Sequence, residues 1–175
     1  MNQKHCQLYM IVEGFRPAVW REIIIPADLI FGELHIVISQ VFEWSKEADY
    51  LFKVGKYEIV DRKNLNLPMG ENKVDGTQSV ETYFFSHKVL TYWRNTSPRV
   101  KVNIIIQKIH QTSSHNMVCL AGENKVCVKD NMVEVPITEI VEKNGLEVHS
   151  QIEKSQVYCV DKNKLNQSLL IGGLQ

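Results

Sequence analysis

Apolar and polar residues alternate near the start of the chain, and a period of two is typical of strands that bury one face. Residues Gln7 to Glu13 alternate in this way. Residues Ala18 to Ile25 are rich in β-branched side chains, and Pro26 ends the run because proline cannot donate to a sheet. The segment from Gly14 to Pro17 has the composition of a turn. We therefore expect two antiparallel strands joined as a hairpin.

The period changes from two to about 3.6 between Phe31 and Trp44, which predicts a helix. Its apolar positions recur at the spacing of one helix face and are Leu34, Val37, Ile38, Val41 and Phe42. Many of them are β-branched, so the intrinsic helix propensity is weak and packing must hold the helix. Asp28 is placed to help cap the start, because Ile30 at the expected cap position has no acceptor.

Further along, apolar runs separated by turn residues predict more strands. These are Tyr50 to Val54, Tyr57 to Val60, Val89 to Trp93, Arg99 to Ile109, Met117 to Leu120, Lys125 to Lys129 and Val157 to Val160. Arg99 to Ile109 alternates most clearly, and the one exception, Ile105, indicates a partly covered polar face. The polar stretch from Asp61 to Ser79 predicts a long loop, and Ile137 to Lys143 predicts a short helix. The tail from Leu165 to Gln175 is ambiguous.

These elements predict an α+β fold with a mostly antiparallel sheet and one main packing helix at about residues 31–44. The opening order of strand, strand, helix, strand, strand is similar to β-grasp arrangements, by analogy alone. The chain has 175 residues and no internal repeat. That length fits one domain, so we expect residues 1–175 to form a single domain.

Composition narrows the function classes. Lys and Arg number 20, Asp and Glu number 20, and the formal net charge is zero. Phosphate-dominated binding needs a basic surplus or patch, so a nucleic-acid role would depend on a patch that the fold creates. The start of the chain lacks a secretory pattern, and its apolar runs are too short to cross a bilayer. We expect a cytoplasmic protein with no membrane segment, and reduced thiols at Cys6, Cys119, Cys127 and Cys159.

Two histidines and two cysteines form one conceivable metal site, drawn from His110, His115, Cys119 and Cys127. Zinc takes about four such ligands, but this spacing matches no standard zinc pattern. We favour small buried thiols on a hairpin around Gly122 instead. Walker, Gly-x-Ser-x-Gly, His-Glu-x-x-His and dinucleotide motifs are all absent. We therefore predict no catalytic residues and no cofactor, and the sequence leans away from an enzyme.

Aromatic and basic residues gather near the clearest strand. Trp93, Arg99 and Lys101 could stack on and contact a single-stranded nucleic acid from one face of a sheet. We favour the alternative of an ordinary solvated face, because a few charges in a strand region are common. Elsewhere, Trp20 and Arg21 point to opposite faces of a strand. For that pair we expect a buried tryptophan and a solvated arginine.

Several segments together resemble a known family. They are Arg16-Pro17-Ala18-Val19-Trp20-Arg21, Pro26-Ala27-Asp28, Leu34-His35 in a helix reaching Trp44, and Cys119-Leu120-Ala121-Gly122-Glu123. In this order they resemble the open-reading-frame-three-like family named from a root-inducing (Ri) plasmid of the bacterium Agrobacterium. The resemblance covers roughly residues 7–130 and leaves 131–175 as a divergent extension. It implies the fold above and a link to mobile elements.

The chain also departs from the family pattern. Ala48-Asp49-Tyr50 stands where the family has a His-Leu-His-like segment, and Val128-Lys129-Asp130 stands where it has Pro-Pro-Glu-Asp. The segment Arg94 to Pro98 and the strand after it lack the family's acidic, Trp and His positions. His35 is therefore expected to be a structural histidine bonded to a backbone carbonyl, because its partners are missing. We expect a non-catalytic accessory or interaction protein. The alternatives are a nucleic-acid-binding accessory protein and a divergent metal-dependent enzyme.

Overall fold

A computed structural model describes residues 3–15, 18–64, 72–96, 99–112, 116–124, 127–129, 132–134 and 162–171. The described elements are β1 (Gln3–Val12), β2 (Trp20–Pro26), α1 (Phe31–Val41), β3 (Tyr50–Val54), β4 (Tyr57–Val60), the 3-10 helix η1 (Arg62–Asn64), β5 (Lys73–Asp75), α2 (Glu81–Phe84), β6 (Val89–Arg94), β7 (Val100–Thr112), β8 (Val118–Glu123), β9 (Cys127–Lys129), β10 (Met132–Glu134) and α4 (Lys162–Ile171).

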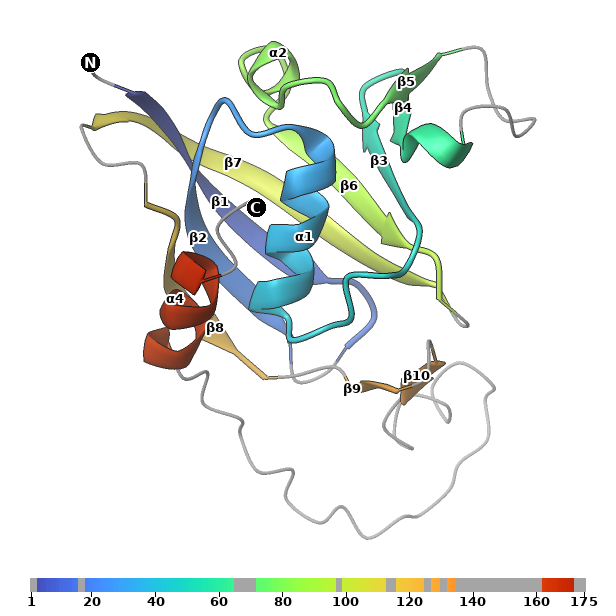
Figure 1. The fold of residues 1–175 in the computed structure, drawn as a ribbon, viewed down its shortest axis with the longest axis vertical. Helices are drawn as coiled ribbons and strands as arrows, with labels where there is room; N and C mark the ends of the chain where they lie inside the picture. The colour runs from blue at the N-terminus through green and yellow to red at the C-terminus, as the bar shows by residue number, and fades with distance from the viewer. Residues whose placement is uncertain are drawn as a thin grey trace, which may run out of the picture.

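Eight of the strands form one sheet in the order β5-β4-β3-β6-β7-β1-β2-β8 (Figure 1). Every neighbouring pair in it is antiparallel except β4 and β5, which run parallel. The strands β9 and β10 pair with each other in a second, two-stranded sheet. The predicted α+β fold with a mostly antiparallel sheet is confirmed, and so is the opening strand–strand–helix unit.

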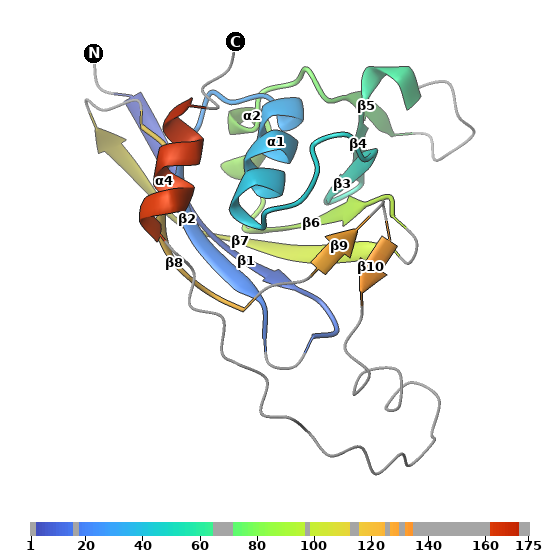
Figure 2. The same cartoon turned by 60° about the horizontal axis from the view of Figure 1, so that its bottom comes forward.

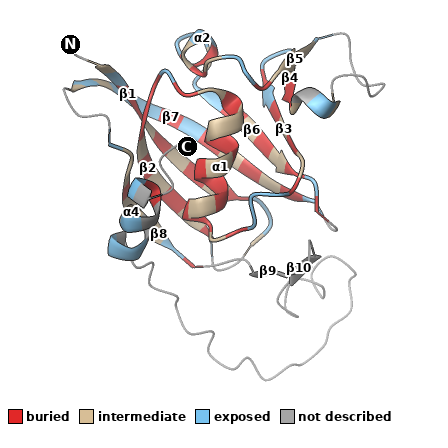
Figure 3. Ribbon diagram, in the orientation of Figure 1, coloured by how far each residue is buried: buried red, intermediate tan, exposed pale blue. Residues whose placement is uncertain are grey.

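The helices α1, α2 and α4 lie on one face of the large sheet (Figure 2). The core lies between α1 and the sheet, and along the strands buried residues alternate with less buried ones (Figure 3). Leu8 and Met10 of β1 are fully buried, as the period of two predicted. The five residues of the predicted helix stripe are buried as well. No described helix covers the opposite face, which we call the open face.

Local bonds set the two ends of α1. The carboxylate of Glu33 accepts a hydrogen bond from the Ile30 backbone N–H at 3.0 Å, so it caps the first turn. The prediction that Asp28 caps the helix is wrong, because its carboxylate accepts a bond from the Gln3 side chain. At the other end Glu43 has a φ of 59° and Trp44 N–H bonds to the Ser39 carbonyl. This is a Schellman-type ending with glutamate in the left-handed position.

Three further predictions need correction. The stretch predicted as one long loop contains η1 and the short strand β5, which adds to the sheet edge beside β4. Ile105 is 39% exposed on the open face, so it does not indicate a covered face. The ambiguous tail contains helix α4, whose Leu169 is buried in the core. The predicted helix at 137–143 and the predicted strand at 157–160 lie outside the described residues.

Candidate functional site

The Trp20 and Arg21 pair shows the opposite burial from the one predicted. Arg21 is fully buried, whereas Trp20 is half-buried on the open face. The guanidinium donates to four backbone carbonyls: Val41 at 2.8 Å, Trp20 at 2.7 Å, Glu123 at 2.9 Å and Asn124 at 2.9 Å. Burial of this charge is tolerated because its donors are occupied by carbonyl dipoles. Arg21 thus joins the end of α1 to the end of β8.

Close approach of Arg21 to the edge strand requires a glycine. A Cβ placed on Gly122 would lie 2.6 Å from the Arg21 Cδ atom and 2.9 Å from the Trp20 carbonyl oxygen. The Phe42 ring lies under the guanidinium, 5.0 Å from its centroid to the Arg21 Cζ atom. The Trp-Arg and Gly-Glu segments that carry the family resemblance therefore meet in one structural junction.

His35 lies at the centre of a second buried network. Its Nδ1 atom is 2.9 Å from the Tyr92 hydroxyl, and its Nε2 atom is 3.0 Å from the Lys46 carbonyl oxygen. The carbonyl can only accept, so Nε2 carries the proton and Nδ1 accepts from Tyr92. Burial lowers the pKa of His35, which keeps the ring neutral. The structure therefore places His35 as the sequence predicted, with a backbone carbonyl as one of two partners.

Arg94 extends this network into the core. Its side chain is fully buried, and its Nη1 atom lies 3.4 Å from the Ser39 hydroxyl. Burial raises the pKa of Tyr92 to about 12, although Arg94 and Ser39 both act to lower it through hydrogen bonds. Among the described residues, the Nε and Nη2 atoms of Arg94 have no partner.

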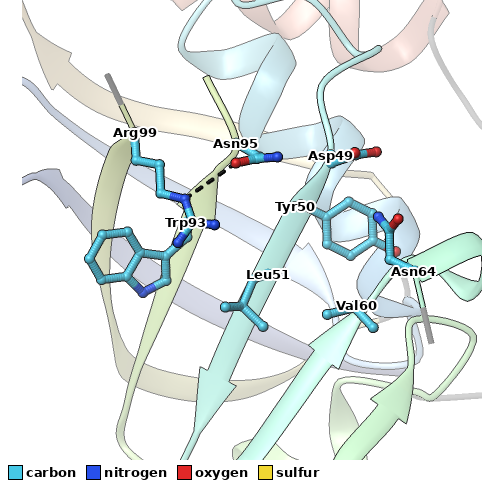
Figure 4. A pocket seen from close by; sticks show the side chains of 8 residues that line it. All are labelled: Asp49, Tyr50, Leu51, Val60, Asn64, Trp93, Asn95 and Arg99. Carbon is cyan, nitrogen blue, oxygen red and sulfur yellow. Dashed lines mark hydrogen bonds between the residues drawn. The ribbon is translucent and has the colours of Figure 1, made fainter. Parts of the chain in front are cut away.

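The open face carries the three residues proposed from sequence for nucleic-acid binding. Trp93 of β6 pairs with Lys101 of β7, whose Nζ atom lies 5.5 Å from the indole centroid. Arg99 precedes β7 and lines a small pocket together with Trp93 (Figure 4). The structure therefore brings all three together, which the sequence spacing alone could not establish.

The pocket at Trp93 has an apolar floor and a polar rim. Leu51 and Val60 face it from β3 and β4, and Asn95 receives a bond from the Arg99 Nε atom at 3.2 Å. Its volume is about 70 Å³, enough for a small side chain or a few waters, because one water needs only ~10–15 Å³. The Trp93 indole N–H is buried and has no partner among the described residues.

Ion pairs neutralise most of the charge around this pocket. Lys101 pairs with Glu13, and Lys63 pairs with Asp49 at 2.6 Å. Arg99 has no carboxylate partner within the described part of the chain. The pocket therefore carries one uncompensated positive charge, near the Trp93 ring.

The residues proposed for a metal site are not brought together where they are described. His110 lies on β7 and Cys119 lies on β8, with β1 and β2 between them in the sheet. Three strand spacings amount to about 14 Å, which is too far for one ion. His115 lies outside the described residues, as does the side chain of Cys127. The described residues contain no group of three His, Cys, Asp or Glu side chains placed to hold a metal ion.

The described cysteine side chains, Cys6 and Cys119, are both buried thiols. Burial raises the pKa of the Cys6 thiol to about 11, with a smaller contribution from the charge of Glu81. Such a thiol is a poor nucleophile, because the thiolate is the reactive form. Cys119 belongs to β8, which pairs with β2, so the predicted hairpin that joins it to Cys127 is wrong.

Sequence reasoning missed a groove on the helix side of β3. It has a volume of about 380 Å³, within the range of small-molecule sites. Its floor is formed by His35 and Tyr50, whose rings stack with centroids 4.6 Å apart. The lining residues are Ile30, Gly32, Glu33, His35, Ile36, Lys46, Tyr50, Asp61, Asp75, Gly76 and Thr77. The groove joins segments far apart in sequence, and spacing along the chain gives no signal of it.

The fold and these two hollows define an α+β protein with one broad antiparallel sheet, helices on one face and candidate binding sites on both faces of β3. The chain belongs to the plasmid pRiA4b ORF-3-like protein family, whose model matches residues 4–144. The family resemblance inferred from the motif segments is thereby confirmed. Helix α4 lies beyond the matched residues.

A solved structure shares this fold. It is the crystal structure of a protein of unknown function from Methanosarcina mazei Go1, with a TM-score of 0.62 and 21% sequence identity. The match covers 70% of this chain and 71% of that chain. No curated protein matches the sequence. Among the described residues, no helix has both the length and the apolar character that crossing a membrane requires.

Proposed function

We propose that this protein is a non-catalytic interaction protein that binds a carboxylate-bearing peptide segment on the open face of its sheet, at the Trp93 pocket. The plasmid description of its family supports an accessory role for a mobile element. The observation that carries the proposal is the uncompensated charge of Arg99 at the rim of an apolar pocket that Trp93 also lines.

The chemistry of the other polar residues supports a binding role. The side chains best suited to catalysis are engaged in bonds that hold the fold: His35 with Tyr92 and Lys46, and Glu33 with the start of α1. An apolar floor with a few placed polar groups is the usual composition of a recognition site. Arg99 suits a carboxylate, because its guanidinium presents paired donors.

Selection of peptides from a random phage-displayed library tests this function. We expect the enriched peptides to contain an acidic residue next to an apolar one. Trp93→Phe removes the N–H together with part of the ring, Arg99→Gln removes the charge together with the guanidinium, and each should weaken binding by about tenfold, or ~1.4 kcal/mol. Trp20→Phe is the matched control, because the Trp20 indole already donates to Glu123 on the same face. Enriched peptides that bind all variants equally would refute the proposal.

A second candidate is single-stranded nucleic-acid binding, because Trp93, Arg99 and Lys101 share one face and an indole can stack on a base. The pairing of Lys101 with Glu13 weakens its case. This function predicts that oligo-dT shifts in a gel at low salt and is released as salt rises. An unchanged mobility of the oligonucleotide at low salt would eliminate it.

A further inference from the structure

The groove on the helix side of β3 and the Trp93 pocket share only Tyr50 among their lining residues, because adjacent residues of β3 point to opposite faces. Tyr50 points toward α1 and into the groove, whereas Leu51 points to the open face. From the residues that line it, we propose that this groove binds a small organic cation of the primary-amine class.

The Tyr50 hydroxyl supplies the first argument. Tyr50 is 8% exposed, and no described residue donates to its hydroxyl or accepts from it. The oxygen faces Gly76, where an added Cβ would overlap it, and Gly32, where a Cβ would lie 3.4 Å away. Two residues without side chains thus leave space around the hydroxyl of a largely buried tyrosine. A hydroxyl that lines a groove and has no partner among the described residues can bond a ligand donor, so such a donor is a suitable occupant.

Charge supplies the second argument. Glu33, Asp61 and Asp75 contribute three carboxylates to the lining, and Lys46 contributes one ammonium group. Lys63 lies 3.8 Å from Asp61 but is held more closely by Asp49, at 2.6 Å. The charges of Asp61 and Asp75 add to burial in raising the pKa of Tyr50. A negative potential therefore acts at the hydroxyl oxygen, and a cation placed there would be stabilised.

The shape of the floor supplies the third argument. The stacked His35 and Tyr50 rings are almost fully buried, so they close the floor of the groove beneath a bound ligand. Ile30 and Ile36 on the wall suit the methylene groups of an alkyl amine. The neutral state of His35 is consistent with a cationic ligand, because a charged imidazole would repel it. An ammonium group can donate to Tyr50 and to the carboxylates at once.

Calorimetry with the full chain tests this inference, with putrescine as the probe at low ionic strength. Butane-1,4-diol and succinate are matched controls of similar length, neutral and anionic. We expect putrescine to bind with a dissociation constant of about 1 mM or tighter, and the two controls not to bind. Absence of putrescine binding, or equal binding of the diol, would overturn the inference.

Two substitutions assign the binding to the groove. Tyr50→Phe removes a hydroxyl that has no protein partner, and Asp75→Asn removes a charge while keeping an oxygen for the Thr77 N–H. Each should weaken putrescine binding by about tenfold, consistent with the loss of one bond to a charged group. Tyr9→Phe on the open face is the matched control and should not change it, and nor should Trp93→Phe. If both groove variants bound putrescine as tightly as the unchanged protein, the ligand would bind elsewhere and the proposal would be wrong.

Discussion

At the scale of single residues, Arg21 illustrates how a charged side chain can serve as structure. Its guanidinium donates to backbone carbonyl oxygens of α1, β2, β8 and the residue after β8. These bonds explain its burial without a carboxylate partner. Sequence alone suggested a solvated arginine, because arginine is rarely buried. The acceptors come from Val41, Glu123 and Asn124, and their convergence depends on the completed sheet.

Because Arg21 joins the end of α1 to the end of β8, we predict that its substitution lowers the stability of the fold. Arg21→Met keeps the volume but leaves four carbonyls without their donor, and each unsatisfied buried group costs ~1–3 kcal/mol. We expect the free energy of unfolding in urea to fall by at least ~3 kcal/mol. Arg21→Lys keeps the charge, but lysine has a single nitrogen to donate from. This variant should therefore lose less stability than Arg21→Met and remain less stable than the unchanged protein. A change below ~1 kcal/mol for Arg21→Met would show that solvent satisfies these carbonyls.

Burial of His35 predicts how the stability of the fold depends on pH. Its pKa in the folded protein is lowered by burial, below the ordinary value of 6.5. The unfolded chain therefore binds a proton more readily, and stability falls as pH drops below about 6.5 towards the lower folded pKa. Urea unfolding between pH about 8 and about 5 should show this slope. His35→Phe should be less stable at pH 8 but flatter with pH, and an identical slope would contradict the assignment.

At the scale of elements, α4 closes an edge of the sheet. The Asn166 amide oxygen accepts from the Cys119 N–H at 2.7 Å, and the amide nitrogen donates to the Cys119 carbonyl at 3.5 Å. A neighbouring strand would present the same donor and acceptor, so the side chain replaces a strand at β8. Leu169 anchors the helix in the core, and Lys164 lies 3.6 Å from Glu43 of the α1 ending. Edge strands need such cover to avoid pairing with other chains.

The two hydrogen bonds between the Asn166 amide and the Cys119 backbone can be tested directly. Asn166→Leu has similar volume but no hydrogen bonds, so the Cys119 amide should exchange with solvent faster by about tenfold or more. Asn163→Leu, on an exposed position of the same helix, is the control. Self-association of Asn166→Leu in sedimentation would support the role of edge cover. Unchanged exchange at Cys119 would show that the amide contact contributes nothing.

At the scale of the whole molecule, the sequence predicted those parts that depend on local period. The alternation of β1 and β7 and the apolar stripe of α1 are visible because a buried face imposes a repeat. The edge strand β5 was missed, because three polar-flanked residues carry no period. The candidate sites were predictable only in part. Trp93 and Arg99 were found from residue type, whereas the Tyr50 groove depends on Gly32 and Gly76, which only the fold brings together.

The sheet as a whole should open from its β5 edge, because stability within it is uneven. β1 pairs with β2 and β7 on both sides, whereas β5 is a three-residue strand that pairs only with β4. Amide exchange should therefore be slowest at Leu8 and Met10 and much faster at Val74. Gly76→Ala places a Cβ against the Tyr50 hydroxyl and 3.1 Å from the Val60 carbonyl oxygen. The strand must shift to relieve both contacts, so exchange should rise in β5 and β4.

Residues of β1 supply the internal control for Gly76→Ala. Four strands, β4, β3, β6 and β7, lie between β5 and β1 in the order of the sheet. A local opening leaves exchange at Leu8 and Met10 unchanged, because those amides are released only by global unfolding. A uniform increase across the sheet would instead show that β5 and the loop at Gly76 belong to the same cooperative unit as the core. That result would also indicate that Tyr50, in the groove floor, is released only when the whole sheet unfolds.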